Sequence, residues 1–207
     1  MRREKIKPGY FDRLYAESGD PWGFSTSAYE REKYAATLDA LPRAAYPRAL
    51  EIGCSIGVFT RGLAPRCGRL LALDCAEGAL TSARRRCAGL SNVSFVHMTV
   101  PDQWPDGAFD LVTLSEVVYY FDRAGVARLA ARVRDALAPQ GQILLVHWLG
   151  ETDYPLGADE AVTAFLEASR DFAAPLLRRR QPEYRLDLLQ AGQRRAARRA
   201  RPWRAPC

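Results

Sequence analysis

Short apolar runs alternate with amphipathic stretches over residues 48–150. The runs that suit strands buried on both faces are residues 50–52, 70–74, 93–97, 111–114 and 143–148. Between them, apolar side chains three and four residues apart predict helices that include residues 80–87 and 126–137. Strands separated by helices require a parallel sheet with right-handed crossovers. The pattern therefore predicts a doubly wound α/β fold.

Further elements are predicted on both sides of this region. They are helices at 8–18, 27–41 and 158–172, and a closing β-hairpin of residues 176–180 and 184–189. Ser27 and Glu30 have the spacing of a capping box at the start of the second helix. We expect an N-terminal helical cap over 1–45, a core over 46–190 and a separate tail over 191–207.

The basic charge of the chain is concentrated in that tail. The formal net charge is +6, from 30 basic and 24 acidic side chains. Residues 191–207 hold six arginines and no acidic residue, so the rest of the chain is charge-balanced. With 48% hydrophobic residues the chain has globular composition, although the tail itself is typical of disorder. A balanced core gives no reason to expect a nucleic-acid partner.

Several classes of protein are excluded by what the sequence lacks. No run of 18 apolar residues occurs, so neither a transmembrane helix nor a membrane partner is expected. The first residues are charged and aromatic rather than an apolar signal-peptide core, which predicts a cytoplasmic protein. Five cysteines without CxxC spacing and two histidines predict free thiols and no metal site.

One segment carries the signature of a bound cofactor. Residues 50–57 read Leu-Glu-Ile-Gly-Cys-Ser-Ile-Gly and connect the first strand to a helix. Gly53 and Gly57 allow a tight turn and a close approach of the backbone to a ligand. Asp74 ends the next strand, 21 residues after Gly53, where a βαβ unit places a carboxylate beside the ribose hydroxyls of a nucleoside.

The spacing distinguishes two nucleoside cofactors. A dinucleotide needs a pyrophosphate cradle, normally GxGxxG, and Gly53 and Gly57 do not match it. S-adenosylmethionine has no phosphate and carries a positively charged sulfonium. The acidic Glu51, ahead of the first glycine, suits that ligand better than pyrophosphate. We therefore expect S-adenosylmethionine as the cofactor.

Four separated blocks occur in the order found in one branch of the class I S-adenosylmethionine-dependent methyltransferases. Residues 20–30, 51–57, 115–120 and 184–189 resemble the nodulation protein S-like family. The resemblance implies a mostly parallel, seven-stranded, Rossmann-like sheet whose last hairpin strand is antiparallel. It also implies N-methylation, because the founding member methylates a glucosamine amine of a chitooligosaccharide. Ser55 departs from the glycine of many members.

The same resemblance implies roles for individual residues around the cofactor. Gly53, Ser55 and Gly57 would line the methionyl part, with Glu51 supporting the loop and Ser115 nearby. Asp74 would bind the ribose, and the loop near Met98 and Thr99 would hold the adenine. Trp22, Tyr29 and Arg31 would close over the cofactor, with Arg31 on its carboxylate. Packing of the N-terminal helices is an alternative role for Trp22 and Tyr29, as a strand-to-helix cap is for Asp74.

A protonated amine cannot attack the methyl group, so the acceptor side needs either a general base or capture of the neutral amine from solution. Glu116 and His147 follow the fourth and end the fifth predicted strands, where such sheets place their ligands. The unperturbed pKa of histidine makes His147 a candidate base near neutrality, but a structural role with a hydrogen bond to a backbone carbonyl is an equal alternative. Glu116 has the alternative of an arginine partner. Tyr120 is a candidate to orient the acceptor; with the adjacent Tyr119, only one of the two rings is expected to face it.

Three functions remain in competition. The first is N-methylation of an amine on a small molecule or amino sugar, with O-methylation left open. The second is an RNA methyltransferase guided by the basic tail, and the third is a non-catalytic Rossmann-like nucleotide-binding module. The sequence leaves the acceptor and the oligomeric state open.

Overall fold

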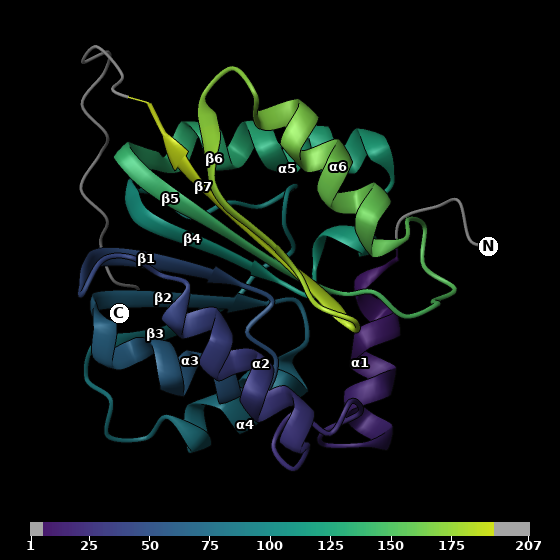
Figure 1. Cartoon of the computed structure of the whole chain (residues 1–207). Coiled ribbons are helices and arrows are strands. Elements are labelled where there is room, and N and C mark those ends of the chain that lie inside the picture. Colours follow the sequence, from purple (N-terminus) through teal and green to yellow (C-terminus); the bar gives the residue numbers. More distant parts are fainter. Residues whose placement is uncertain (1–5, 193–207) are drawn as a thin grey trace. The chain divides into compact units, whose positions relative to one another are not determined.

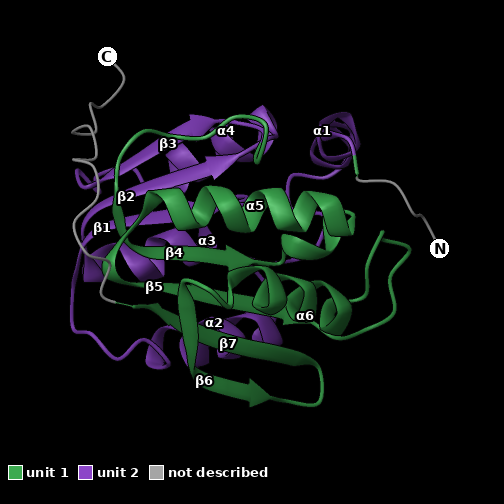
Figure 2. Ribbon diagram, turned by 90° about the horizontal axis from the view of Figure 1, so that it is seen from above, with its two compact units in different colours: residues 1–6, 100–207 green, residues 7–99 purple. Residues whose placement is uncertain are grey.

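The computed structural model describes residues 6–192 (Figure 1). They fall into two compact units, which Figure 2 shows in different colours. We call Lys7–Thr99 the N-terminal unit; the C-terminal unit consists of Ile6 and the chain from Val100 onward. The arginines of the predicted tail, from Arg194 on, lie outside the described residues.

The N-terminal unit holds three parallel strands in the order β3-β2-β1. Its elements are α1 (Pro8–Glu17), α2 (Ala28–Asp39), β1 (Tyr46–Ile52), α3 (Val58–Leu63), η1 (Ala64–Arg66), β2 (Cys67–Asp74), α4 (Glu77–Arg86) and β3 (Val93–His97). In the register, Leu50 lies beside Leu71 and Leu73 beside Val96. Strands β1 and β2 begin earlier than expected because half-buried Arg48 and exposed Arg69 still pair along the backbone.

The C-terminal unit holds four strands in the order β4-β5-β7-β6. Its elements are β4 (Phe109–Ser115), η2 (Val118–Tyr120), α5 (Arg123–Ala136), β5 (Leu137–Trp148), α6 (Ala158–Ser169), β6 (Ala173–Arg180) and β7 (Tyr184–Ala191). Strands β4 and β5 are parallel, and β7 runs antiparallel between β5 and β6 (Figure 1). The predicted closing hairpin is therefore present.

The helix ends follow the local chemistry of the sequence. Ser27 caps α2, since its side chain accepts a hydrogen bond from the amide of Glu30. The amide of Ser27 donates to the carbonyl of Gly23, so it does not need the reciprocal contact of a full capping box. Asp122 caps α5 in the same way through the amide of Gly125. Helix α5 ends at Ala136, ahead of Pro139 and Gly141.

Burial follows the predicted periodicity. Val126, Leu129 and Val133 of α5 are fully buried, which confirms the expected apolar stripe. Helices α5 and α6 lie side by side in the C-terminal unit (Figure 1). None of the helices within residues 6–192 has the length and apolar character needed to cross a membrane. The same residues contain no cluster of three or more side chains suited to a metal ion.

Candidate functional site

The loop after β1 is tied to the end of β2 by its backbone. The amides of Gly53 and Cys54 both donate to the carbonyl of Leu73, at 2.8 and 2.9 Å. Gly53 and Gly57 have φ of 76° and 78°, in the left-handed region that favours glycine. A Cβ on Gly57 would lie 3.0 Å from the Cα and Cβ of Ala83 in α4. The glycine spacing seen in the sequence is thus a steric requirement of this loop.

Asp74 holds the same loop from the end of β2. One carboxylate oxygen accepts from the amide of Ser55 at 2.8 Å, and the other accepts from the amide of Ala76 at 3.0 Å. Burial raises the pKa of Asp74, and these amides oppose the shift because they stabilise the charged form. Asp74 therefore has two structural roles: it caps the turn before α4, and it holds the backbone of the loop after β1. A carboxylate has about four acceptor positions, so capacity for ligand hydroxyls remains.

Glu51 lies beneath the loop and is almost fully buried. Burial raises the pKa of its carboxyl group to about 8, although the hydroxyl of Thr60 opposes the shift. At neutral pH most Glu51 side chains therefore carry a proton. Glu51 provides a buried polar group beside the loop and little negative charge, so the expectation that its charge suits the sulfonium is not supported.

The N-terminal helices bring an aromatic cluster to this loop. The hydroxyl of Tyr15 in α1 lies 2.5 Å from Ser55 Oγ. Trp22 meets Tyr15 edge-on at 5.7 Å between ring centroids and stacks on Phe24 at 5.6 Å. Asp20 closes the loop between α1 and α2, because its side chain accepts from the amide of Phe24 at 2.8 Å. The half-buried Trp22 thus packs against Tyr15 and Phe24 beside the loop.

The remaining predicted cofactor residues of this unit lie in α2 and in the segment after β3. In α2, the ring of Tyr29 faces the ammonium of Lys33 at 5.2 Å, and exposed Arg31 donates to the carbonyl of Thr26. Met98 and Thr99 follow β3, where the amide of Met98 donates to the carbonyl of Asp74 at 2.9 Å. Met98 is thereby linked to the end of β2.

Sequence reasoning did not include Tyr15 among the site residues. Phe11 and Tyr15 are four residues apart in α1, and this spacing indicates only a packed helix face. The link to Ser55 joins residues 40 positions apart, and no local pattern reports it.

Glu116 of the C-terminal unit is held by two hydrogen bonds. It follows Ser115, the last residue of β4, and has φ of 57°, which is rare for a residue other than glycine. One carboxylate oxygen accepts from the Tyr119 hydroxyl at 2.6 Å and from the Trp148 amide at 2.9 Å. Strained backbone of this kind is concentrated at functional sites.

His147 is held differently, although it comes from the neighbouring strand. Its side chain is wholly buried, and Nε2 accepts a hydrogen bond from the amide of Val118 at 3.0 Å. An imidazole that accepts at Nε2 is neutral and carries its proton on Nδ1. The Nε2 lone pair is therefore engaged by the backbone.

Three tyrosines pack together beside these groups. Tyr119 and Tyr120 meet at 4.8 Å between ring centroids, and Tyr154 contacts them at 5.2 and 4.7 Å. Tyr119 is buried and Tyr120 is half-buried, as expected for adjacent residues of which one belongs to the core. Burial raises the pKa of Tyr119 well above its ordinary value, and the nearby charge of Glu116 adds to the shift. Tyr154 comes from the loop after β5 and was not expected from the sequence.

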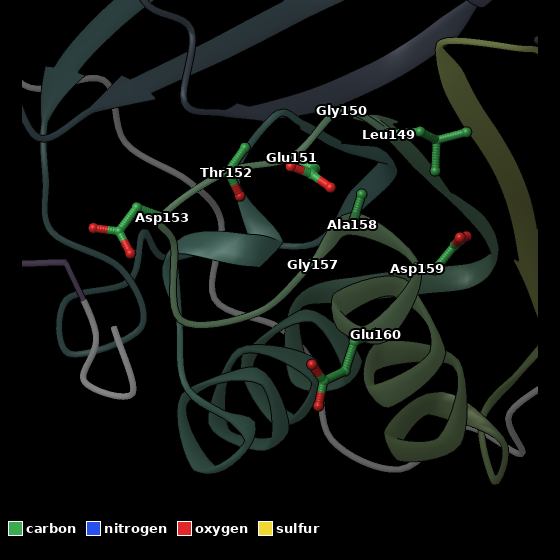
Figure 3. Close-up of a pocket in the computed structure, with 9 residues that line it drawn as sticks. All are labelled: Leu149, Gly150, Glu151, Thr152, Asp153, Gly157, Ala158, Asp159 and Glu160. Atoms are coloured by element: carbon green, nitrogen blue, oxygen red, sulfur yellow. The ribbon is translucent and has the colours of Figure 1, made fainter. Parts of the chain in front are cut away.

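That loop also forms a pocket of about 680 Å³ (Figure 3). Its lining residues are Leu149, Gly150, Glu151, Thr152, Asp153, Gly157, Ala158, Asp159 and Glu160. Every charged residue among them is acidic. Asp159 is paired with Arg180 and Arg185, which lowers its pKa, and Glu160 is paired with Arg123. The pocket starts directly after Trp148, whose amide binds Glu116.

Solved structures define the class of protein. The N-methyltransferase NodS from Bradyrhizobium japonicum WM9, in complex with S-adenosyl-L-homocysteine, is similar with a TM-score of 0.77 and 25% identity; 88% of this chain and 97% of that one are covered. A putative methyltransferase from Pseudomonas syringae is 36% identical, with a TM-score of 0.70 over 79% of this chain and 99% of the other. These likenesses confirm the predicted α/β methyltransferase fold.

The family model described as nodulation protein S (NodS) matches residues 12–147, and the chain belongs to this family. Nodulation protein S of Sinorhizobium fredii is 32% identical over 127 residues, which are 60% of this chain and 59% of that protein. The corresponding protein of Rhizobium tropici is 34% identical, over 60% of this chain and 53% of the relative. The match thus spans little more than half the length of these curated relatives.

Proposed function

We propose that this protein is an S-adenosylmethionine-dependent N-methyltransferase that acts on an amine of a small molecule or amino sugar. The observation that carries the proposal is the loop at the end of β1, where Asp74 holds the amide of Ser55 between two left-handed glycines. Membership of the nodulation protein S family and the likeness to an N-methyltransferase solved with S-adenosylhomocysteine support it.

The residues present fit this cofactor. Gly53 and Gly57 leave the loop without side chains at two positions, and Gly57 could not be replaced without displacing Ala83. When bound, S-adenosylmethionine supplies an electrophilic methyl group on a sulfonium sulfur. The residues proposed to hold it are Gly53, Ser55, Gly57 and Ser115 at the methionyl part, Glu51 under the loop, Asp74 at the ribose, Met98 and Thr99 at the adenine, and Trp22, Tyr29 and Arg31 as the closing group.

Glu116 is the proposed catalytic residue on the acceptor side. Methyl transfer to a neutral amine moves positive charge onto nitrogen, and a carboxylate at that nitrogen stabilises the charge as it develops. The Tyr119 hydroxyl and the Trp148 amide hold Glu116 in one orientation. His147 is less suited to take a proton, because its Nε2 accepts from the Val118 amide. Half-buried Tyr120 is proposed to orient the acceptor.

The charge of the C-terminal unit supports an amine as the acceptor. In the pocket after Trp148, Asp159 and Glu160 are paired with arginines. Glu151 and Asp153 add negative charge beyond these pairs, which favours a cationic amine over a phosphodiester. The RNA alternative depends on the basic tail, which lies outside the described residues. A cytoplasmic location stays a prediction of the sequence.

Two measurements test the proposal. Calorimetric titration should show binding of S-adenosylmethionine and S-adenosylhomocysteine and no binding of NAD. Transfer of labelled methyl groups should then occur to glucosamine oligosaccharides or other primary amines. Binding of NAD without either sulfur ligand would overturn the cofactor assignment. Methylation of RNA in preference to amines would overturn the acceptor.

A further inference from the structure

Ser55 is the residue of the cofactor loop whose conformation is hardest to explain from the loop alone. Its φ of 50° lies in the left-handed region, where a side chain is strained and glycine is not. Gly53 and Gly57 on either side also have positive φ, but they avoid the strain because they have no side chain. A serine that keeps this conformation needs contacts that compensate for the strain.

Two contacts meet at Ser55 from opposite ends of the residue. Its amide donates to Asp74 at 2.8 Å, and its hydroxyl lies 2.5 Å from the hydroxyl of Tyr15. The first contact depends only on the backbone, so a glycine would keep it. The second exists only because position 55 carries a hydroxyl group.

Tyr15 is well placed to act as a fixed partner. It is 9% exposed and packs with Ile56, Ala76 and Ala79, which border the same loop. Burial raises the pKa of its hydroxyl far above the ordinary value, so the group stays protonated and acts through its hydrogen bond. Tyr15 belongs to α1, so the contact ties the position of this helix to the shape of the loop.

We propose that Tyr15 is a positioning residue for the cofactor loop, acting through the side chain of Ser55, so that docking of α1 and binding of the cofactor favour each other. This inference rests on the proposed cofactor. The hydrogen bond between the hydroxyls of Tyr15 and Ser55 then couples the position of helix α1 to the conformation of the loop. A glycine at position 55 releases the loop from that dependence.

A double-mutant cycle tests the coupling. Tyr15→Phe removes the hydroxyl and keeps the ring, and we expect it to weaken binding of S-adenosylhomocysteine about 5- to 10-fold, the range of one lost hydrogen bond. In the Ser55→Gly background, the same change should alter the dissociation constant by less than about 2-fold. Tyr10→Phe, which removes a hydroxyl elsewhere on α1, is the matched control and should leave affinity within about 2-fold.

Hydrogen exchange gives a second, independent result. S-adenosylhomocysteine should raise the protection of α1 amides in the wild-type chain and raise it less in Ser55→Gly. Equal effects of Tyr15→Phe in the wild-type and Ser55→Gly backgrounds, or ligand-independent protection of α1, would overturn the proposal. If the wild-type chain binds neither sulfur ligand, the proposed function itself fails, which is a distinguishable outcome.

Discussion

The two units of this chain hold their candidate site residues by different physical means. In the N-terminal unit the loop is held through the main chain, by amides on Asp74 and by glycines in the left-handed region. In the C-terminal unit the site is made of side chains, with Tyr119 bonded to Glu116 and Tyr154 packed on both neighbouring tyrosines. The arrangement in the N-terminal unit depends mainly on backbone geometry, and the arrangement in the C-terminal unit depends on contacts between particular side chains.

This difference separates two tasks. A loop held mainly by main-chain amides and glycines depends on few side chains, namely Asp74 and the pair of Ser55 and Tyr15, which suits a ligand common to a whole class of enzymes. A site of side chains on η2, β5 and the following loop changes with each substitution, which suits an acceptor particular to one protein. Changes in the first unit should therefore alter cofactor affinity, and changes in the second should alter the chemical step.

The largest effect is expected from Glu116→Gln. The amide keeps the size of the side chain but removes the charge proposed to face the acceptor nitrogen, so kcat should fall about 100- to 1000-fold. The dissociation constant of S-adenosylhomocysteine should stay within about 2-fold. Glu167→Gln, an exposed change in α6 of the same unit, is the control for steady-state kinetics. An unchanged kcat in Glu116→Gln would contradict the proposal that the C-terminal unit governs the chemical step.

Asp74→Ala should give the converse result. The amides of Ser55 and Ala76 lose their acceptor, and the ribose loses its proposed partner. We expect the affinity for S-adenosylhomocysteine to fall about 100-fold, close to 2.7 kcal/mol, in a calorimetric titration. Asp74→Asn retains an acceptor oxygen, so its affinity for S-adenosylhomocysteine should lie between those of the wild type and Asp74→Ala. Wild-type affinity in Asp74→Ala would show that the main-chain arrangement does not govern cofactor binding.

Gly57→Ala tests the steric part of the same arrangement. The added Cβ meets Ala83 at 3.0 Å and must adopt a φ of 78°, so the free energy of unfolding in urea should fall by roughly 2 kcal/mol. Gly89→Ala is a matched control, because its φ is 91° but no atom lies within 4 Å of the new Cβ. The difference between the two variants isolates the contact with Ala83. If the free energy of unfolding fell equally in both variants, the positive φ alone would explain the loss, and the contact with Ala83 would contribute nothing.

The last prediction concerns the pH dependence of stability that arises from the buried carboxyl group of Glu51. Its pKa in the folded protein is raised to about 8, so the folded state binds the proton more tightly than the unfolded state. The contribution of Glu51 to the free energy of unfolding therefore falls as the pH rises from about 4.5 to 8, and levels off above that range. Glu51→Gln does not titrate, so its stability relative to wild type should grow as the pH rises from 5 to 9. Parallel pH profiles in urea unfolding would contradict a raised pKa.

The elements of the fold were largely predictable from local patterns. The strand at 93–97 was located to the residue, and the helix expected at 8–18 spans Pro8–Glu17. Longer differences arose where pairing overrides composition. Strand β5 begins at Leu137 rather than at 143, because its early residues pair beside β4 although Pro139 and Gly141 suggest a break.

The candidate site was predictable only on the side governed by the main chain. Gly53, Gly57 and Asp74 could be found because their spacing follows from the geometry of a βαβ unit. Tyr15 and Tyr154 could not, since their contacts join segments that are separated in the sequence. The hydrogen bond from the Val118 amide to His147 Nε2 could not be predicted either, because it joins residues 29 positions apart.

The sequence by itself determined the alternation of strands and helices, the glycine loop and the carboxylate at the end of β2, because each follows from periodicity or fixed spacing along the chain. Only the tertiary structure decided that Asp74 grips the loop, that Tyr15 reaches Ser55, and that Glu116 is held by Tyr119 and the amide of Trp148. Those contacts depend on which segments are brought together in space, and no local pattern contains that information.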